Sequence, residues 1–173
     1  MKYISYLCGM KLMFLDIDGV ICTSACYGVG KNNKWDVYMF DSKAVAVLNF
    51  ILQETGAEII LSSDWKNDHT LQEMREIFSH FGVIRGPIGF TPNSKTYTGM
   101  NLEGGRADEI KMWLKIHAWK DDVTYVVIDD LPMGEFFPNN FVLCPREQEG
   151  IKRNGIKDNI LTILNGQTNG RLE

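Results

Sequence analysis

The sequence predicts an α/β fold, a three-layer sandwich in which helices cover both faces of a central parallel sheet. Short apolar runs alternate with longer segments of helical periodicity, which is typical of parallel sheets with helical crossovers. The length of 173 residues suits one ordinary domain, so we expect a single domain over residues 1–173. Three of the apolar runs end in polar pairs, which are Asp16 with Asp18, Ser62 with Ser63, and Asp129 with Asp130.

The first half of the chain supplies two strands and one helix. Residues 1–9 precede Met10, a natural start, and we interpret them as a dispensable extension. Residues 11–16 form an apolar strand, and residues 20–40, rich in Gly, Asn and Ser, form a loop or small flap. Asp41 can cap a helix that runs to Thr55 and ends at Gly56, and residues 58–61 form the second strand.

In the second half, apolar residues spaced by three and four predict a helix over 71–81, with Asp68 as its cap. Residues 83–104 form a long irregular connection. A helix then opens at Gly104, Gly105 and Arg106. Further strands are predicted over 123–128 and 141–143, and a last helix over 156–164.

Composition excludes several classes of protein. Hydrophobic residues at 45% and charged residues at 23% exclude a disordered chain. A net charge of −4 argues against sequence-independent coating of nucleic acid or anionic membrane. The spacing of Cys8, Cys22, Cys26 and Cys144 fits neither a zinc knuckle nor a disulfide framework, so we expect reduced thiols in a cytoplasmic protein. No segment resembles a signal peptide or membrane span, and we expect no membrane partner.

The carboxyl ends of parallel strands meet at one edge of a sheet, where ligands bind. Asp16 can act there as a nucleophile, with Asp18 as an adjacent general acid and base; the alternative is an Asx turn with no catalytic role. Asp129 and Asp130 bring further carboxylates to the same place, where their repulsion requires a cation. Oxygen-only ligands favour Mg²⁺.

Other polar residues near these strand ends can bind a phosphate. The Ser62 hydroxyl is the first choice and Ser63 the second, although a Ser pair after a strand is also typical of a turn. Arg106 combines a guanidinium with free N–H groups at a helix start, which suits a dianion. Lys66 and Lys111 are fallback cations.

The motifs Phe14-Leu-Asp16-Ile-Asp18-Gly19, Ile60-Leu-Ser62-Ser63-Asp-Trp65-Lys66, Arg106 with Glu109, and Val127-Ile-Asp129-Asp130 occur in this order along residues 11 to about 151. Together they resemble the haloacid dehalogenase (HAD) superfamily of phosphotransferases. More narrowly, they are similar to the HAD domains of Swiss-Army-knife RNA repair proteins and, more distantly, to the phosphatase domain of polynucleotide kinase-phosphatase.

The resemblance implies a Rossmann-like HAD fold and a Mg²⁺-dependent phosphatase. It implies that Asp16 forms an aspartyl-phosphate and that Asp18 protonates the leaving oxygen. Ser62 would hold the phosphoryl group, and Arg106 would replace the usual lysine of the third motif. Asp129 and Asp130 would complete the Mg²⁺ site with Asp16 and the Asp18 carbonyl. Because dehalogenases of the superfamily lack the second aspartate, phosphoryl transfer is favoured over carbon–halogen cleavage.

The gaps between motifs leave no room for a full cap domain, and the resemblance implies that such open sites accept the ends of large substrates. The resemblance to the narrower relatives implies a 3′-phosphate on RNA or DNA as the substrate. Trp65, Lys66, Arg85, Lys95 and Arg106 could then line a strand-binding groove. The alternative is that Trp65 packs against the helix predicted over 71–81 and that these cations are merely solvated. A small nucleotide or sugar phosphate is the second substrate hypothesis, and a non-catalytic binding module with the same fold is the third.

Overall fold

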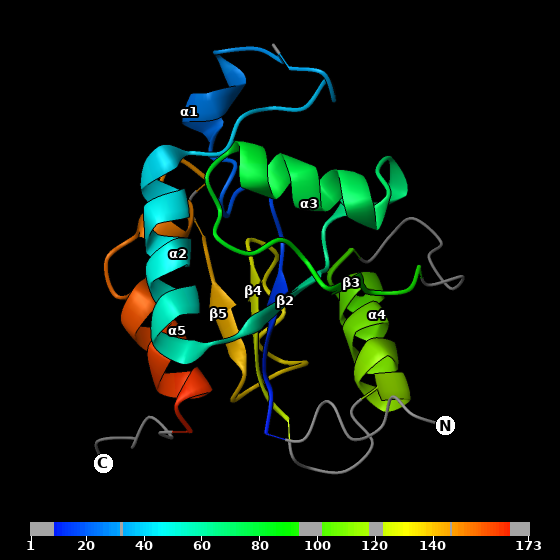
Figure 1. Cartoon of the computed structure of the whole chain (residues 1–173). Coiled ribbons are helices and arrows are strands. Elements are labelled where there is room, and N and C mark those ends of the chain that lie inside the picture. The colour runs from blue at the N-terminus through cyan, green and yellow to red at the C-terminus, as the bar shows by residue number, and fades with distance from the viewer. Residues whose placement is uncertain (1–8, 32, 94–101, 118–122, 146, 167–173) are drawn as a thin grey trace.

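The computed structural model describes residues 9–31, 33–93, 102–117, 123–145 and 147–166, so the predicted extension falls almost wholly outside them. Five parallel strands form one sheet in the order β3-β2-β1-β4-β5 (Figure 1). The strands are β1 (Lys11–Leu15), β2 (Glu58–Leu61), β3 (Gly89–Phe90), β4 (Thr124–Asp129) and β5 (Phe141–Leu143). The predicted α/β class with a central parallel sheet is confirmed.

The central strand β1 is buried on both faces, which explains its continuous apolar run. Met13 and Leu15 point to one face, where they join a core with the helices α2 (Ser42–Thr55), α3 (Leu71–His80) and α5 (Ile156–Leu164). Leu12 and Phe14 point to the other face and pack against α4 (Leu102–His117). Helices therefore cover both faces of the sheet (Figure 1).

The predicted ends of α2 are confirmed. The Asp41 carboxylate accepts hydrogen bonds from the backbone N–H groups of Lys43 and Ala44, and it also pairs with Lys152. Gly56 ends the helix with φ of +68°, a conformation that favours glycine.

The predicted start of α3 is wrong, because Thr70 and not Asp68 is its cap. The Thr70 hydroxyl accepts from the Glu73 N–H, and the Glu73 carboxylate accepts from the Thr70 N–H in return. This reciprocal pair satisfies two backbone donors that a lone Asp68 would leave to water.

The predicted start of α4 is also wrong, since the helix begins at Leu102 and not at Gly104. Arg106 therefore lies in the second turn, where its backbone N–H is no longer free to bind an anion. Any role of Arg106 depends on its guanidinium alone. The connection before α4 also contains the short strand β3, which the sequence analysis did not predict.

Residues 20–31 and 33–40 belong to the segment that was predicted to form a loop or small flap. The flap contains one helical turn, α1 (Ser24–Tyr27), and its far part rests on α3. The Trp35 ring lies 5.3 Å from the His80 ring, and Lys34 Nζ lies 3.1 Å from Glu76 Oε2. The three described cysteines are buried free thiols. Within the described part of the chain, we find no helix with the length and hydropathy of a membrane span.

Candidate active site

Three neighbouring strand ends bring the predicted site residues together. Leu15 is in register with both Leu61 of β2 and Ile128 of β4. The ladder extends one residue further, because the Asp16 N–H donates to the Ile128 carbonyl at 3.0 Å and the Ser62 N–H donates to the Leu15 carbonyl at 3.0 Å. The predicted convergence of these three segments at the carboxyl edge of the sheet is therefore observed.

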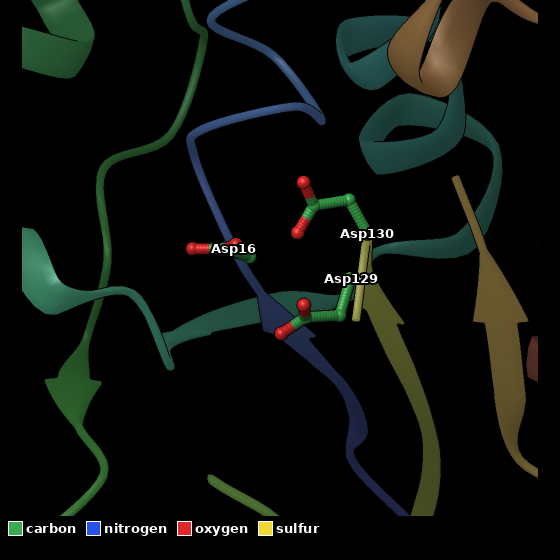
Figure 2. A group of neighbouring side chains, drawn as sticks. All are labelled: Asp16, Asp129 and Asp130. Atoms are coloured by element: carbon green, nitrogen blue, oxygen red, sulfur yellow. The ribbon is translucent and has the colours of Figure 1, made fainter. Parts of the chain in front are cut away.

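Asp16, Asp129 and Asp130 form an acidic cluster at this edge (Figure 2). Each offers a carboxylate oxygen, and these oxygens lie within 4.8 Å of one another. Asp16 is 3% exposed and Asp129 is fully buried. Buried carboxylates at this separation repel each other strongly, and a hard divalent cation such as Mg²⁺ fits an oxygen-only donor set.

The Asp18 carboxylate is not part of this cluster. Its Oδ2 accepts a hydrogen bond of 2.8 Å from the Trp65 indole N–H. The two aspartates of the first motif thus have different surroundings, as expected for two different roles. The ligand expected from Asp18 is its backbone carbonyl, which stays a prediction.

Position 19 requires a glycine because it lies against the acidic cluster. Its φ is +70°, and a Cβ at this position would lie 2.3 Å from Asp130 Oδ2. Any side chain here would displace the Asp130 carboxylate. This contact between Gly19 and the Asp130 carboxylate was not predicted from the sequence.

Arg106 is the cation that the structure places in the cluster. Its Nη1 lies 2.8 Å from Asp16 Oδ2 and 3.1 Å from Asp129 Oδ2, and its Nη2 lies 3.5 Å from Asp64 Oδ2. The guanidinium side chain is 12% exposed. Arg106 therefore orients the two most buried carboxylates, although it leaves the three clustered aspartates with excess negative charge.

The pKa values of the three clustered aspartates are all raised. Burial and the neighbouring Asp129 raise the pKa of Asp16 to about 8, although Arg106 acts in the opposite direction. Burial and Asp129 also raise the pKa of Asp130 to about 6, and burial raises the pKa of Asp129. The cluster holds protons more tightly than free carboxylates do, which is the behaviour of a site that accepts a cation.

Ser62 and Ser63 are each 1% exposed. Within the described part of the chain, neither hydroxyl has a hydrogen-bond partner in normal geometry. The Ser63 hydroxyl nevertheless lies close enough to Asp16 to favour the charged form of its carboxyl group, which lowers the pKa of Asp16. Buried hydroxyls without a protein partner are uncommon. Phe14 and Ile60 both face α4, so Asp16 and Ser62, two residues further along each strand, extend toward the same face.

A cavity of about 720 Å³ opens in front of the strand ends. The residues that line it are mostly polar: Asp16, Asp18, Ser63, Asp64, Asn67, Asp68, Asn93, Leu102, Arg106, Glu109, Asp130 and Leu131. Six of these are carboxylates, while Arg106 is the cation among the described lining residues. Asp64, Asn67 and Asp68, which also line the cavity, were not predicted from the sequence, where their only signal was their position shortly after Ser63.

The expected strand-binding groove stays a prediction, but several of the described cations already have partners within the protein. Lys66 is nearly buried, and its ammonium binds Glu109 and Thr91. Arg85 donates to the Gly56 carbonyl at the opposite end of β2. Lys111, a fallback cation, lies over the Phe136 ring. Lys95 lies outside the described residues.

The parallel sheet, the aspartate pair after β1 and the acidic end of β4 define a hydrolase domain of the HAD superfamily. The model of the HAD domain in Swiss Army Knife RNA repair proteins matches residues 12–155, and the chain belongs to this family. The resemblance inferred from the motifs is thereby confirmed.

The chain also has a partial match to one characterised protein. The chain is 32% identical over 72 residues to an N-formyl-4-amino-5-aminomethyl-2-methylpyrimidine deformylase from Halalkalibacterium halodurans. That match covers 39% of this chain and only 17% of the relative's length. No solved structure matches the chain.

Proposed function

We propose that the chain is a Mg²⁺-dependent phosphomonoester hydrolase that acts through an aspartyl-phosphate on Asp16. The arrangement that supports this proposal is the acidic cluster with Arg106 on one side of the cavity and the separately held Asp18 in the same cavity. Phosphoryl transfer by this route requires a nucleophile, a general acid and base, and a positively charged group that binds the phosphoryl oxygens.

In the first step, a carboxylate oxygen of Asp16 attacks phosphorus while the bond from phosphorus to the ester oxygen breaks. Asp18 gives its proton to the departing oxygen, which leaves as an alcohol. In the second step, Asp18 takes a proton from water, and the water oxygen attacks phosphorus. The bond between phosphorus and Asp16 breaks, which releases inorganic phosphate and restores the Asp16 carboxylate.

The chain's own residues provide the placement. Arg106 holds Asp16 through Nη1 and retains donors for a phosphoryl oxygen. Asp16, Asp129 and Asp130 would hold Mg²⁺, which would supply the positive charge that keeps Asp16 ionised and stabilises charge on the phosphoryl oxygens. The unpaired Ser62 hydroxyl would donate to the phosphoryl group.

The two serines allow a paired test. We expect Ser62→Ala to lower kcat/KM about 10- to 100-fold, the range for loss of one hydrogen bond to a charged group. We expect Ser63→Ala to lower kcat/KM as well, because Ser63 lines the cavity and lies close to the Asp16 carboxylate, whereas Ser62 is not among the lining residues. Thermal unfolding should show that Ser62→Ala is not destabilised, since the hydroxyl it removes has no hydrogen-bond partner among the described residues. A larger loss in Ser63→Ala would reverse the assignment.

For the substrate, we propose the 3′-phosphate of RNA or DNA, which the family's association with RNA repair supports. A specific observation favours a second candidate, a small nucleotide or sugar phosphate. Six carboxylates line the cavity, and they would repel the neighbouring phosphates of a polynucleotide.

One experiment separates these candidates. The protein is incubated with Mg²⁺ and p-nitrophenyl phosphate, mononucleotides, sugar phosphates, and RNA and DNA oligonucleotides phosphorylated at either end. A preference of orders of magnitude for 3′-phosphorylated oligonucleotides supports end repair, and a preference for a monomer supports the second candidate. Release of phosphate from none of them, in wild type and in Asp16→Asn alike, would leave the non-catalytic binding module.

A further inference from the structure

Trp65 makes a contact that its predicted role as a stacking surface does not explain. The residue lies in a single 3₁₀ turn, η1 (Asp64–Asn67), which follows Ser63 directly. Its indole N–H donates to Asp18 Oδ2 at 2.8 Å. Trp65 is absent from the residues that line the cavity. The indole N–H of Trp65 is therefore already bound to Asp18.

The indole packs against a buried aromatic ring, which is itself part of an aromatic cluster. The Trp65 ring lies 5.8 Å from the ring of Phe40, which is 2% exposed. Phe40 in turn packs against Phe78 at 5.2 Å and Phe81 at 4.9 Å. Side chains in such a packed cluster occupy one rotamer, so the indole N–H has a fixed direction.

The backbone around Asp18 is fixed independently. Asp18 forms a bridge with Cys22, and the Gly19 N–H donates to the Cys22 carbonyl at 2.9 Å. This turn sets the position of the Asp18 Cα, but the carboxyl group still requires a contact that selects its orientation. The hydrogen bond from Trp65 is such a contact, and it stands beside a weaker one from the buried Cys22 thiol.

We propose that Trp65 is a positioning residue, whose indole N–H occupies Asp18 Oδ2 and so leaves Oδ1 to carry the transferred proton. This role rests on the proposed phosphatase function. In the first step, the Oδ1–H bond breaks and the leaving oxygen gains the proton. In the second step, Oδ1 takes a proton from the attacking water. Without the indole N–H, the carboxyl group would rotate, and productive orientations would become less frequent.

The kinetic test uses Trp65→Phe, which retains an aromatic ring against Phe40 and removes the N–H. The matched control is Trp35→Phe. Trp35 lies in the far part of the flap, where its ring packs against His80 of α3. Both are compared with wild type for kcat/KM on an alkyl phosphate and on p-nitrophenyl phosphate. An alkoxide needs a proton to leave, whereas nitrophenolate leaves without one.

We expect Trp65→Phe to lower kcat/KM about 10- to 100-fold on the alkyl phosphate and only slightly on p-nitrophenyl phosphate. Trp35→Phe should leave the ratio of the two substrates unchanged. Equal losses on both substrates, or no loss, would overturn the positioning role while the phosphatase function stands. Absence of turnover in wild type would overturn the function itself, and this role with it.

A second measurement is independent of activity. The indole N–H resonance of Trp65 is assigned in a ¹⁵N-labelled sample by its disappearance in Trp65→Phe. In Asp18→Ala, we expect this resonance to move upfield and its exchange with water to accelerate, because the acceptor is lost. An indole resonance that does not respond to Asp18→Ala would overturn the proposal, whatever the kinetics show.

Discussion

Asp16→Asn is expected to lower phosphatase activity by about 10⁴-fold or more, because the amide is a poor nucleophile and the covalent intermediate cannot form. The same change should not unfold the protein. Burial and the nearby Asp129 raise the pKa of Asp16 to about 8, so the native structure disfavours its charged form. A neutral amide of similar shape removes that cost, while Arg106 keeps its contact with Asp129.

The measurement combines initial rates on the preferred substrate with thermal unfolding in the absence of Mg²⁺. At pH 8 we expect Asp16→Asn to unfold at the same temperature as wild type or a higher one. Asp68→Asn is the matched control, since Asp68 is exposed and lines the same cavity but lies outside the acidic cluster. It should retain activity within about threefold. Near-wild-type turnover by Asp16→Asn would exclude Asp16 as the nucleophile.

Much of the fold could be predicted because it depends on local patterns. The apolar runs of β1 and β4 are buried on both sheet faces, and the Asp41 and Gly56 signals at the ends of α2 depend on residues within one turn. The convergence of Asp16 and Asp129 then follows from parallel strand topology alone.

The errors arose where the structure depends on distant partners or weak signals. β3 is a pair of residues, Gly89 and Phe90, which is too short for any periodicity. Gly104 and Gly105 are poor helix formers, yet α4 passes through both, because Ala107 and Ile110 anchor the helix to the sheet.

The assignments of Trp65 and Lys66 show the same limit at the site itself. Their polar groups bind Asp18 and Glu109, which lie 47 and 43 residues away along the chain. The sequence shows that Trp65 and Lys66 follow Ser63. It does not show that the polar group of each one already binds another residue of the protein. Reading them as substrate contacts assumed that they were free.

Mg²⁺ is expected to stabilise the protein more as the pH rises from 5 to 8. The pKa of Asp130 is raised to about 6 and that of Asp16 to about 8, both above the unfolded value of 3.8. In this interval the folded metal-free protein therefore binds protons that the unfolded chain has lost, and its stability falls with rising pH. The lowered pKa values of Asp41, Glu73 and Glu76 act in the opposite sense, but only at more acidic pH.

Because Mg²⁺ binds the deprotonated carboxylates, it competes with protons at pH 5 and offsets the repulsion fully at pH 8. At a concentration about 100 times its Kd, it should add about 2.7 kcal/mol, or roughly 5–10 °C in Tm for a chain of this size. Thermal unfolding with Mg²⁺, with chelator, and with NaCl of equal ionic strength measures this effect. Asp130→Asn should reduce the Mg²⁺ response at pH 8. A Tm increase that NaCl reproduces, or that does not change with pH, would show that the acidic cluster is not a metal site.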